Sequence, residues 1–259
     1  MNMVKQGLFG TVVHCDGGYC HDLRDEILGG NVNRHYRLRN YLHRNCENYP
    51  THELGPIAQI LNINRGNRFL SLVSVASGAH GMNEYAKQNK NVDPALQTAH
   101  FAQGDVISTI IKCANGETIT LSLDTTLPRA YSRKFTVRGT LGMYMEDNNS
   151  VYLDSDFTEA DHWCWSKQWN NAETYLEKYE HPVWEKYLKE GIRGGHGGMD
   201  GLVYDAFIEA VRNGTPCPID VYDAAAWMAV TPLSEASIAM GGTPVAFPDF
   251  TNGAFCDRK

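Results

Sequence analysis

Five runs of strand-forming residues in the middle of the chain constrain its fold more than any other feature. The runs cover residues 69–76, 106–113, 118–123, 135–139 and 143–146. Asn115-Gly116 lies between the second and third runs, and Asn-Gly is typical of a compact hairpin turn. Residues 139–142 mark a second tight reversal, between the last two runs. This region therefore predicts an antiparallel meander with one face available for packing.

The first third of the chain predicts a strand, a loop and a short helix. Residues 10–19 combine β-branched residues with terminal glycines, which suits a strand that carries Tyr19 to its end. Residues 29–43 show weak periodicity and predict an irregular loop. Residues 53–61 place their apolar side chains on one helical face, and Thr51 is expected to cap that helix. Polar side chains on the loop are candidates for site chemistry.

The last third changes to helical periodicity. Amphipathic or apolar patterns cover residues 171–189, 199–212 and 221–240, and these helices are expected to cover the sheet. No repeat and no Ser/Pro/Gly-rich linker divides the chain, so residues 1–259 are predicted to form a single domain. The order of elements predicts an α+β fold, with a large, open, mostly antiparallel or mixed sheet covered on one face by helices.

The chain lacks the fingerprint of a dinucleotide-binding fold. No Gly-x-Gly-x-x-Gly follows a predicted strand, and the glycine-rich residues 194–198 lie between two helical segments. This chain alone therefore offers no NAD-binding half.

Charge and hydropathy argue against two classes of partner. The net charge is -7 and the 23 basic residues are scattered, so no surface is expected to follow a nucleic acid. No window approaches about 18 consecutive apolar residues, and the N-terminus has no apolar signal core. Neither a membrane span nor an export signal is visible, and the compartment stays open.

The cysteines predict neither a disulfide framework nor a metal site. Seven widely spaced cysteines favour mostly buried thiols and leave room for one exposed reactive thiol. Cys20, His21, His43 and Cys46 are donors of the right type for zinc. They form neither a Cys-x-x-Cys nor a His-x3-His clip, so separate core and site residues are the commoner outcome, and no metal is predicted.

Tyrosines and histidines are concentrated in two short segments. Tyr19 and His21 stand at the end of the first predicted strand, and Tyr49 and His52 flank the start of the helix that follows. Pro50 favours extended backbone at Tyr49. Phenols and imidazoles pass protons and hydrogen-bond to sugar hydroxyls, so this composition is typical of a site rather than of a core.

Six motifs, spread in order over nearly the whole chain, resemble one enzyme family. They are Gly18-Tyr19-x-His21-Asp22-Leu23-Arg24, Tyr49-Pro50-Thr51-His52, and residues 61–69, 113–118, 195–200 and 221–227. Together they resemble the C-terminal domain of glycoside hydrolase family 109, which consists of NAD-dependent α-N-acetylgalactosaminidases within the glucose-fructose oxidoreductase superfamily. The resemblance implies a large open mixed sheet backed by helices.

The resemblance also implies a cofactor and a missing part. Enzymes of this family carry an N-terminal Rossmann domain that binds most of the NAD, and this sequence lacks it, so the chain is expected to be an inactive fragment. The implied substrate is a glycoconjugate with terminal α-N-acetylgalactosamine. In the implied reaction NAD takes hydride from the sugar C3 and later returns it, while a base removes the C2 proton so that the glycosidic oxygen leaves C1 and water adds back. Such enzymes are exceptions to the paired-carboxylate mechanism.

The resemblance assigns roles to individual residues. Substrate contacts fall on Tyr19, Arg37, Tyr49, Pro50, Thr51, His52 and Tyr131. Tyr49 is also placed near the nicotinamide. Tyr19 is the implied base, and His52 is our choice for the proton shuttle at the C3 hydroxyl. A phenolic base needs its pKa of about 10 lowered, and a cation such as Arg37 or a protonated imidazole is expected to lower it.

Structural alternatives stay open for several side chains. Ring packing is the alternative for Tyr19 and Tyr131, a solvated charge for Arg37, and a helix-start position for His52. His21 is as readily a structural histidine, bonded to Asp22 or to a backbone carbonyl. His196 orients a site group or, as is slightly favoured, has a structural role at the start of a helix with Asp200. Three tryptophans in residues 163–169 form a sugar-stacking platform or, as favoured here, anchor an irregular segment to the sheet.

Two other function classes also remain open. An NAD(P)-dependent sugar oxidoreductase of the same superfamily would release reduced cofactor instead of cleaving a glycoside. The chain could also be an inactive fragment that acts only in assembly. The resembling sheet commonly forms subunit contacts, so a homo-oligomer through the sheet is expected.

Overall fold

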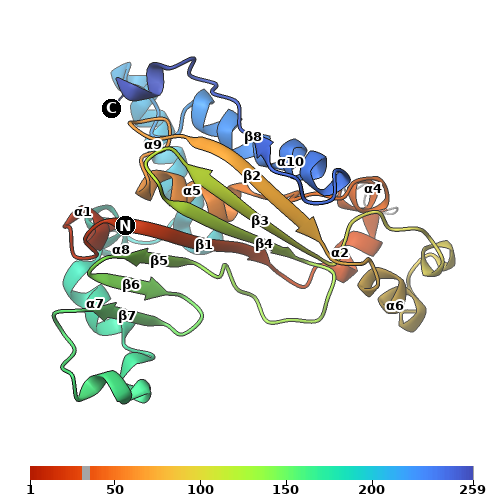
Figure 1. The fold of residues 1–259 in the computed structure, drawn as a ribbon, viewed down its shortest axis with the longest axis horizontal. Coiled ribbons are helices and arrows are strands. Elements are labelled where there is room, and N and C mark those ends of the chain that lie inside the picture. The colour runs from red at the N-terminus through yellow and green to blue at the C-terminus, as the bar shows by residue number, and fades with distance from the viewer. Residues whose placement is uncertain (31–35, 259) are drawn as a thin grey trace.

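An eight-stranded mixed sheet forms the centre of the computed structural model, which describes residues 1–30 and 36–258 (Figure 1). The strands are β1 (Val12–Cys20), β2 (Phe69–Ala76), β3 (Val106–Cys113), β4 (Thr118–Asp124), β5 (Thr136–Gly139), β6 (Gly142–Met145), β7 (Ser150–Leu153) and β8 (Val245–Ala246). Helices lie along one side of this sheet. The predicted α+β fold is therefore confirmed, with β7 and β8 as strands that the sequence patterns did not indicate.

The strand order departs from the predicted meander at one point. The order is β7-β6-β5-β1-β4-β3-β2-β8, and all neighbours pair antiparallel except β1 and β4, which are parallel. The predicted hairpin between β3 and β4 is confirmed, and Gly116 supplies its positive φ of 107°. The prediction of one continuous meander is wrong, because β1 lies between β4 and β5 and pairs with both of them.

The two faces of the sheet have different surroundings. Side chains alternate along a strand, so Cys15, Gly17 and Tyr19 of β1 share the helix-covered face with the buried residues of β4 that they pair with. On the opposite face, Val75 and Ile110 are 55% and 50% exposed. Self-association through this uncovered face stays a prediction.

Helices α5 and α10 cover one face of the sheet. The α-helices are α1 (Asn2–Lys5), α2 (Arg24–Leu28), α4 (Tyr36–His43), α5 (Thr51–Ile60), α6 (Gly81–Gln88), α7 (Ala172–Tyr179), α8 (Pro182–Glu190), α9 (Met199–Asn213) and α10 (Val221–Ala239). The short 3-10 helices are η1 (Pro94–Gln97), η2 (Asp161–Trp163), η3 (Trp165–Gln168), η4 (His196–Gly198) and η5 (Ala254–Cys256). α5 packs on β1 and α10 on β2 (Figure 1).

Helix α4 occupies much of the segment that was predicted to be an irregular loop. The loop prediction for residues 29–43 is wrong over α4, and residues 31–35 lie outside the described part of the chain. Arg37, Leu38 and Tyr41 are the buried residues of α4. An arginine on the buried side obscures the apolar periodicity from which a helix is predicted.

The helical predictions for the last third need two corrections. Residues 171–189 form two helices, because Pro182 lacks an N–H and begins α8 instead of continuing α7. The predictions for α9 and α10 are confirmed to within one residue at their ends. However, α9 leaves its apolar side chains off the sheet, since Val203 and Val211 are 66% and 65% exposed.

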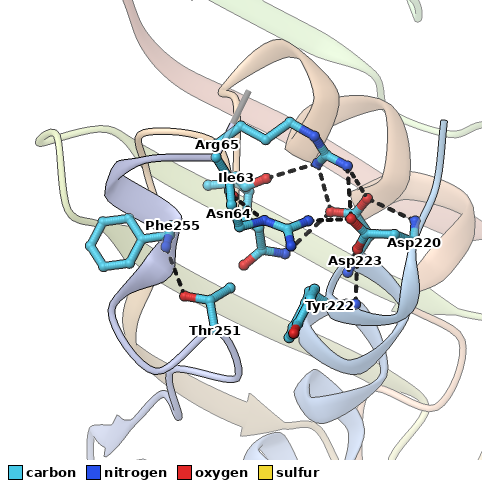
Figure 2. A network of polar contacts seen from close by, with 9 residues as sticks. Ile63, Asn64, Arg65, Asp220, Tyr222, Asp223, Thr251 and Phe255 are labelled. Carbon is cyan, nitrogen blue, oxygen red and sulfur yellow. Dashed lines mark hydrogen bonds and ion pairs between the residues drawn. The ribbon is translucent and has the colours of Figure 1, made fainter. Parts of the chain in front are cut away.

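A network of polar contacts joins the end of α5 to the start of α10 (Figure 2). Arg65 donates to both carboxylate oxygens of Asp223, at 2.9 and 2.8 Å, and Asn64 donates to the same carboxylate at 3.2 Å. Asp220 caps α10 by accepting from the backbone N–H groups of Tyr222 and Asp223, at 2.9 and 3.1 Å. The network fixes α10 against the loop that follows α5.

The cysteine thiols are mostly buried, as predicted. Four of the seven free cysteines are buried, Cys217 is partly exposed, and Cys164 and Cys256 are exposed. In residues 1–30 and 36–258, we find no helix with the length and apolar character that crossing a membrane requires.

Candidate active site

Tyr19 stands at the C-terminal end of β1 beside a buried cation. The Tyr19 side chain is 8% exposed. Arg37 of α4, also 8% exposed, places Nη2 at 3.5 Å from the Tyr19 phenol oxygen and Nη1 at 2.5 Å from Oε1 of Glu26 on α2. The guanidinium carbon also lies 5.1 Å from the centre of the Tyr49 ring, within the range of a cation–π contact. Arg37 thus holds positive charge next to the phenol.

Tyr19, Tyr49 and His52 form a three-ring cluster. The ring centres of Tyr19 and Tyr49 lie 4.4 Å apart, those of Tyr19 and His52 5.2 Å apart, and those of Tyr49 and His52 4.7 Å apart. These are the separations of aromatic rings in direct contact. The rings come from β1, from the loop before α5 and from the first turn of α5. The fold therefore brings together the two segments that the sequence singled out.

His21 and Tyr131 extend this cluster outward. The His21 ring lies 6.1 Å from that of Tyr19 and 5.2 Å from that of Tyr131, the latter at an angle of 87°. Nδ1 of His21 lies 3.2 Å from the Asp22 carbonyl oxygen, so the structural alternative for His21 is also present. Tyr131 is 52% exposed, and its phenol oxygen accepts a hydrogen bond of 2.9 Å from Nε of Arg133. Tyr131 marks the open side of the cluster.

Pro50 and Thr51 position the start of α5. Pro50 is buried and occupies the N-cap position, and Thr51 is the first helical residue. The prediction that Thr51 caps α5 is wrong, because neither residue makes a side-chain capping hydrogen bond and Thr51 already lies inside the helix. Together with Tyr49, both residues line a hollow of about 280 Å³ that α4 and α10 also border.

The close approach of α5 to β1 depends on Gly17. A Cβ added at this position would lie 2.8 Å from Cβ of Glu53 and 3.0 Å from Cδ1 of Ile57. Any side chain here would push the helix away from the strand. Gly17 therefore allows α5 to place His52 against Tyr19.

The pKa values of Tyr19 and His52 are shifted in opposite directions. Burial raises the pKa of Tyr19, and the opposing effect of Arg37 is smaller. The expectation of a lowered phenol pKa is therefore wrong for this structure, and Tyr19 keeps its proton at neutral pH. Burial lowers the pKa of His52, and the positive charge of Arg133 lowers it further. The site thus pairs a phenol that holds a proton with a neutral imidazole that can accept one.

His196 and the tryptophans lie outside the ring cluster. The His196 side chain is 75% exposed, and its Nδ1 lies 3.1 Å from both carboxylate oxygens of Asp200, as in the structural alternative. His196 nevertheless lowers the pKa of His52 through its charge. Trp163, Trp165 and Trp169 are 76%, 61% and 51% exposed. The prediction that the rings anchor their segment to the sheet is therefore wrong for Trp163 and Trp165, whereas Trp169 borders a hollow together with residues of β6 and β7.

Two buried carboxyl groups near the cluster were not predicted. Glu47 and Glu53 are 0% and 1% exposed. Within the described residues, both carboxyl oxygens of Glu53 and Oε2 of Glu47 lack a hydrogen-bond partner. Burial raises the pKa of Glu47 to about 8, and burial together with the neighbouring Glu47 raises that of Glu53 well above its ordinary value. The sequence signal was present, because Glu53 lies four residues before Ile57 on the apolar face of its helix.

The thiols considered for zinc are not suited to metal binding. Burial raises the pKa of Cys20 to about 11 and that of Cys46 to about 12, and a metal ligand must be a thiolate. Across the part of the chain that the structure describes, no group of three or more His, Cys, Asp or Glu side chains could hold a metal ion.

The described residues fit only one end of a dinucleotide. The Tyr49 ring, which is partly exposed, is suited to contact a planar ring such as nicotinamide. In residues 1–30 and 36–258, the only parallel strand pair is β1 with β4, and helices and the strands β2 and β3 lie between them in the chain. This connection is not the glycine-rich strand-to-helix turn that cradles a pyrophosphate.

Comparisons with known proteins identify long relatives. Residues 1–257 match the family model described as Glycosyl hydrolase 109, C-terminal domain. An alpha-N-acetylgalactosaminidase of Tannerella forsythia is 40% identical over 277 residues, which cover 100% of this chain and 58% of the relative. An alpha-N-acetylgalactosaminidase of Shewanella oneidensis is 39% identical over 262 residues, which cover 100% of this chain and 56% of the relative. The chain thus spans less than two thirds of the length of these relatives.

Solved structures share the fold. Levoglucosan dehydrogenase in complex with NADH superimposes with a TM-score of 0.59 at 16% identity, covering 96% of this chain and 62% of that one. An inositol dehydrogenase homolog complexed with NAD+ from Azotobacter vinelandii gives a TM-score of 0.57 at 14% identity, covering 95% and 60%. At these identities the likeness is one of fold.

Proposed function

Because the chain belongs to the glycosyl hydrolase 109 family and matches its C-terminal domain, we propose that the protein removes terminal α-N-acetylgalactosamine from glycoconjugates with NAD as cofactor. The names of the relatives from Tannerella forsythia and Shewanella oneidensis support this substrate. The chain itself would supply the sugar-binding side of the site.

The observation that carries the proposal is the ring cluster. Tyr19, Tyr49 and His52 are in contact, Tyr131 lies at the open side, and the Arg37 cation lies behind. Ordinary glycosidases use two carboxyl groups that flank the bond to be cleaved. Glu47 and Glu53 are 0% and 1% exposed, so they cannot flank a bound sugar, and the more exposed Glu26 is ion-paired with Arg37. Phenols and an imidazole fit a mechanism that moves protons on the sugar ring.

His52 is proposed to take the proton from the C3 hydroxyl. Its pKa is lowered by burial and by positive charge nearby, so at neutral pH the ring is unprotonated and can act as a base. The ring belongs to the first turn of α5, and contact with Tyr19 and Tyr49 fixes its orientation.

Tyr19 is proposed to remove the C2 proton. Since burial raises the pKa of Tyr19, the phenol must first lose its own proton. Arg37, 3.5 Å from the phenol oxygen, is placed to stabilise the phenolate. We therefore expect the activity to depend on a group that ionises on the alkaline side.

The remaining residues are proposed to bind. Arg37, Pro50, Thr51 and Tyr131 would contact the sugar. NAD, when bound, supplies the acceptor and donor of hydride for the sugar C3, and Tyr49 is the residue proposed to touch its nicotinamide ring. Assayed alone, the 259-residue chain is expected to show no turnover, since most cofactor contacts would lie elsewhere.

The proposal is tested on the full-length protein that contains this chain. A chromogenic α-N-acetylgalactosaminide is supplied in deuterium oxide, with and without NAD. We expect release of the aglycone only with NAD, and deuterium at C2 of the released sugar. His52→Gln and Tyr19→Phe are each expected to lower kcat by about 10²- to 10⁴-fold.

Tyr152→Phe is the matched control. Tyr152 lies on β7, where its ring stacks on Phe157, outside the cluster, so turnover should be unchanged. Cleavage without deuterium at C2 would contradict proton removal there. Accumulation of reduced cofactor without cleavage would instead identify a sugar oxidoreductase.

A further inference from the structure

The backbone of residues 131–134 is fixed to the end of β1. The N–H of Cys20 donates to the carbonyl oxygen of Ser132 at 3.2 Å, and the N–H of Ser132 donates back to Cys20 at 3.0 Å. The N–H of Gly18 donates to the carbonyl oxygen of Arg133 at 2.5 Å. Three backbone hydrogen bonds thus hold Arg133 beside the strand residues that flank Tyr19.

The side chain of Arg133 holds Tyr131 at the open side of the cluster. Nε of Arg133 donates to the Tyr131 phenol oxygen at 2.9 Å. Tyr131 is 52% exposed, and its other contact with the cluster is the His21 ring at 5.2 Å. An exposed tyrosine loses rotamer freedom when it is ordered, and this hydrogen bond offsets part of that cost.

The charge of Arg133 acts on His52. Three groups on three elements act on the imidazole through positive charge: Arg133 of the segment after β4, Arg37 of α4 and, when protonated, His196 of η4, with Arg133 having the largest effect of the three. Arg37 is ion-paired to Glu26 of α2, and Nδ1 of His196 lies 3.1 Å from the Asp200 carboxylate of α9. Arg133 makes no ion pair with any residue that the structure describes. No carboxylate in the described part of the chain therefore compensates its positive charge.

Other titratable groups face His52 from the neighbouring elements. The phenols of Tyr19 and Tyr49 lie against the ring from β1 and from the loop before α5, and the Tyr19 phenol is uncharged at neutral pH. On α5 itself, Glu53 is buried, and burial keeps it protonated more readily than an ordinary carboxyl group. Arg133 also lowers the pKa of Glu53, so it acts on both neighbouring residues of α5.

We propose that Arg133 is a positioning residue of this site: its guanidinium orients Tyr131 at the open side, and its charge acts on the His52 imidazole. The meaning of this role rests on the proposed function, because a proton acceptor at the sugar C3 must be neutral before it acts. The geometry itself does not depend on the reaction.

The first test follows the imidazole of His52 by NMR in the full-length protein labelled at histidine, with His52→Gln to assign the signal. Arg133→Met removes the charge, so we expect the pKa of His52 to rise. Arg133→Gln should raise it as well, and Arg133→Lys should keep it close to the wild-type value. Arg138→Met, at an exposed position of β5, is the matched control and should leave it unchanged. An unchanged His52 titration in folded Arg133→Met and Arg133→Gln would overturn the proposal.

The second test separates the charge of Arg133 from its hydrogen bond. In the full-length enzyme, the acidic limb of the pH profile of kcat/KM should move to higher pH in Arg133→Met but not in Arg133→Lys. Tyr131→Phe should raise KM without moving that limb, because it removes the acceptor and leaves the charge. A limb that stays in place in Arg133→Met contradicts the proposal. Absence of turnover in the wild type would count against the proposed function alone, since the His52 titration needs no substrate.

Discussion

Two acidic side chains, Glu53 in the first turn of α5 and Asp223 of α10 near the other end of α5, have equally low exposure and opposite surroundings. Asp223 and Glu53 are each 1% exposed. Burial raises the pKa of Asp223, but the bonds from Arg65, the Asp220 backbone and Asn64 outweigh it, so the pKa lies below its ordinary value (Figure 2). Glu53 has no hydrogen-bond partner among the residues described, and its pKa lies well above the ordinary value. Partners therefore decide which of two buried carboxyl groups is charged.

The difference also separates structural from functional use of a buried acid. Near the C-terminal end of α5, Arg65 and Asp223 form a satisfied ion pair that joins two segments of the chain. At the N-terminal end, Glu53 follows His52 directly and stays unsatisfied. Violations of polar satisfaction are expected mainly where a site needs them.

The largest expected effect on stability comes from removing Asp223, the buried acid whose carboxylate has hydrogen-bond partners. Asp223→Ala leaves Arg65 without its bidentate partner and removes the acceptor of Asn64. Loss of one member of a buried pair costs about 3 kcal/mol or more of the free energy of unfolding. Urea denaturation monitored by circular dichroism measures this loss. Asp205→Asn, in a pair whose side chains are 62% and 46% exposed, is the control and should cost at most about 1 kcal/mol. Equal losses of stability in the two variants would contradict the distinction between a buried and an exposed ion pair.

A smaller, pH-dependent effect on stability is expected from replacing Glu47 or Glu53 near the N-terminal end of α5. The folded pKa of Glu47 is about 8 against an ordinary value of 4.5. Between these values the folded state binds more protons than the unfolded state, so stability falls as the pH rises. Glu47→Gln and Glu53→Gln remove this effect, so both should gain stability relative to the wild type as the pH rises from 5 to 8, Glu47→Gln by on the order of 2 kcal/mol. Urea midpoints across this range measure the gain. A constant difference between variant and wild type would contradict the raised pKa values.

The smallest effect is expected for a pair of intermediate exposure. Arg44 donates from Nε and Nη2 to the Glu235 carboxylate, which joins the residue after α4 to α10, and both side chains are 35% exposed. Glu235→Gln should cost about 0.5 kcal/mol at low salt and less in 1 M salt. Thermal unfolding at the two salt concentrations measures it. A cost as large as that of Asp223→Ala would show that burial is not the controlling variable.

The sequence predicted the parts of the fold that local patterns determine. The hairpin at Asn115-Gly116 and the helix α10 follow from turn chemistry and from apolar runs. The insertion of β1 between β4 and β5 could not be predicted in this way, because pairing between distant strands leaves no local pattern. Pro182 was visible, yet the charged periodicity around it was interpreted as one helix.

The site was predicted in its members but not in its electrostatics. The resemblance indicated Tyr19, Tyr49 and His52, and the structure brings their rings into contact. The raised pKa of Tyr19 depends on burial by residues far away in the sequence, so the sequence could not indicate it. Arg133 was missed for the same reason, since its neighbours on β1 lie more than a hundred positions earlier in the chain.

The close backbone approach of β1 and α5 at Gly17 sets the distance between the Tyr19 phenol and the His52 imidazole. Strand and helix already touch there, because even one added carbon would overlap with Glu53. Trimming either ring would leave a gap that the partner cannot close by sliding inward. A side chain that replaces Tyr19 or His52 must therefore have the same length to keep this contact. With a shorter side chain, a water molecule would have to fill the gap.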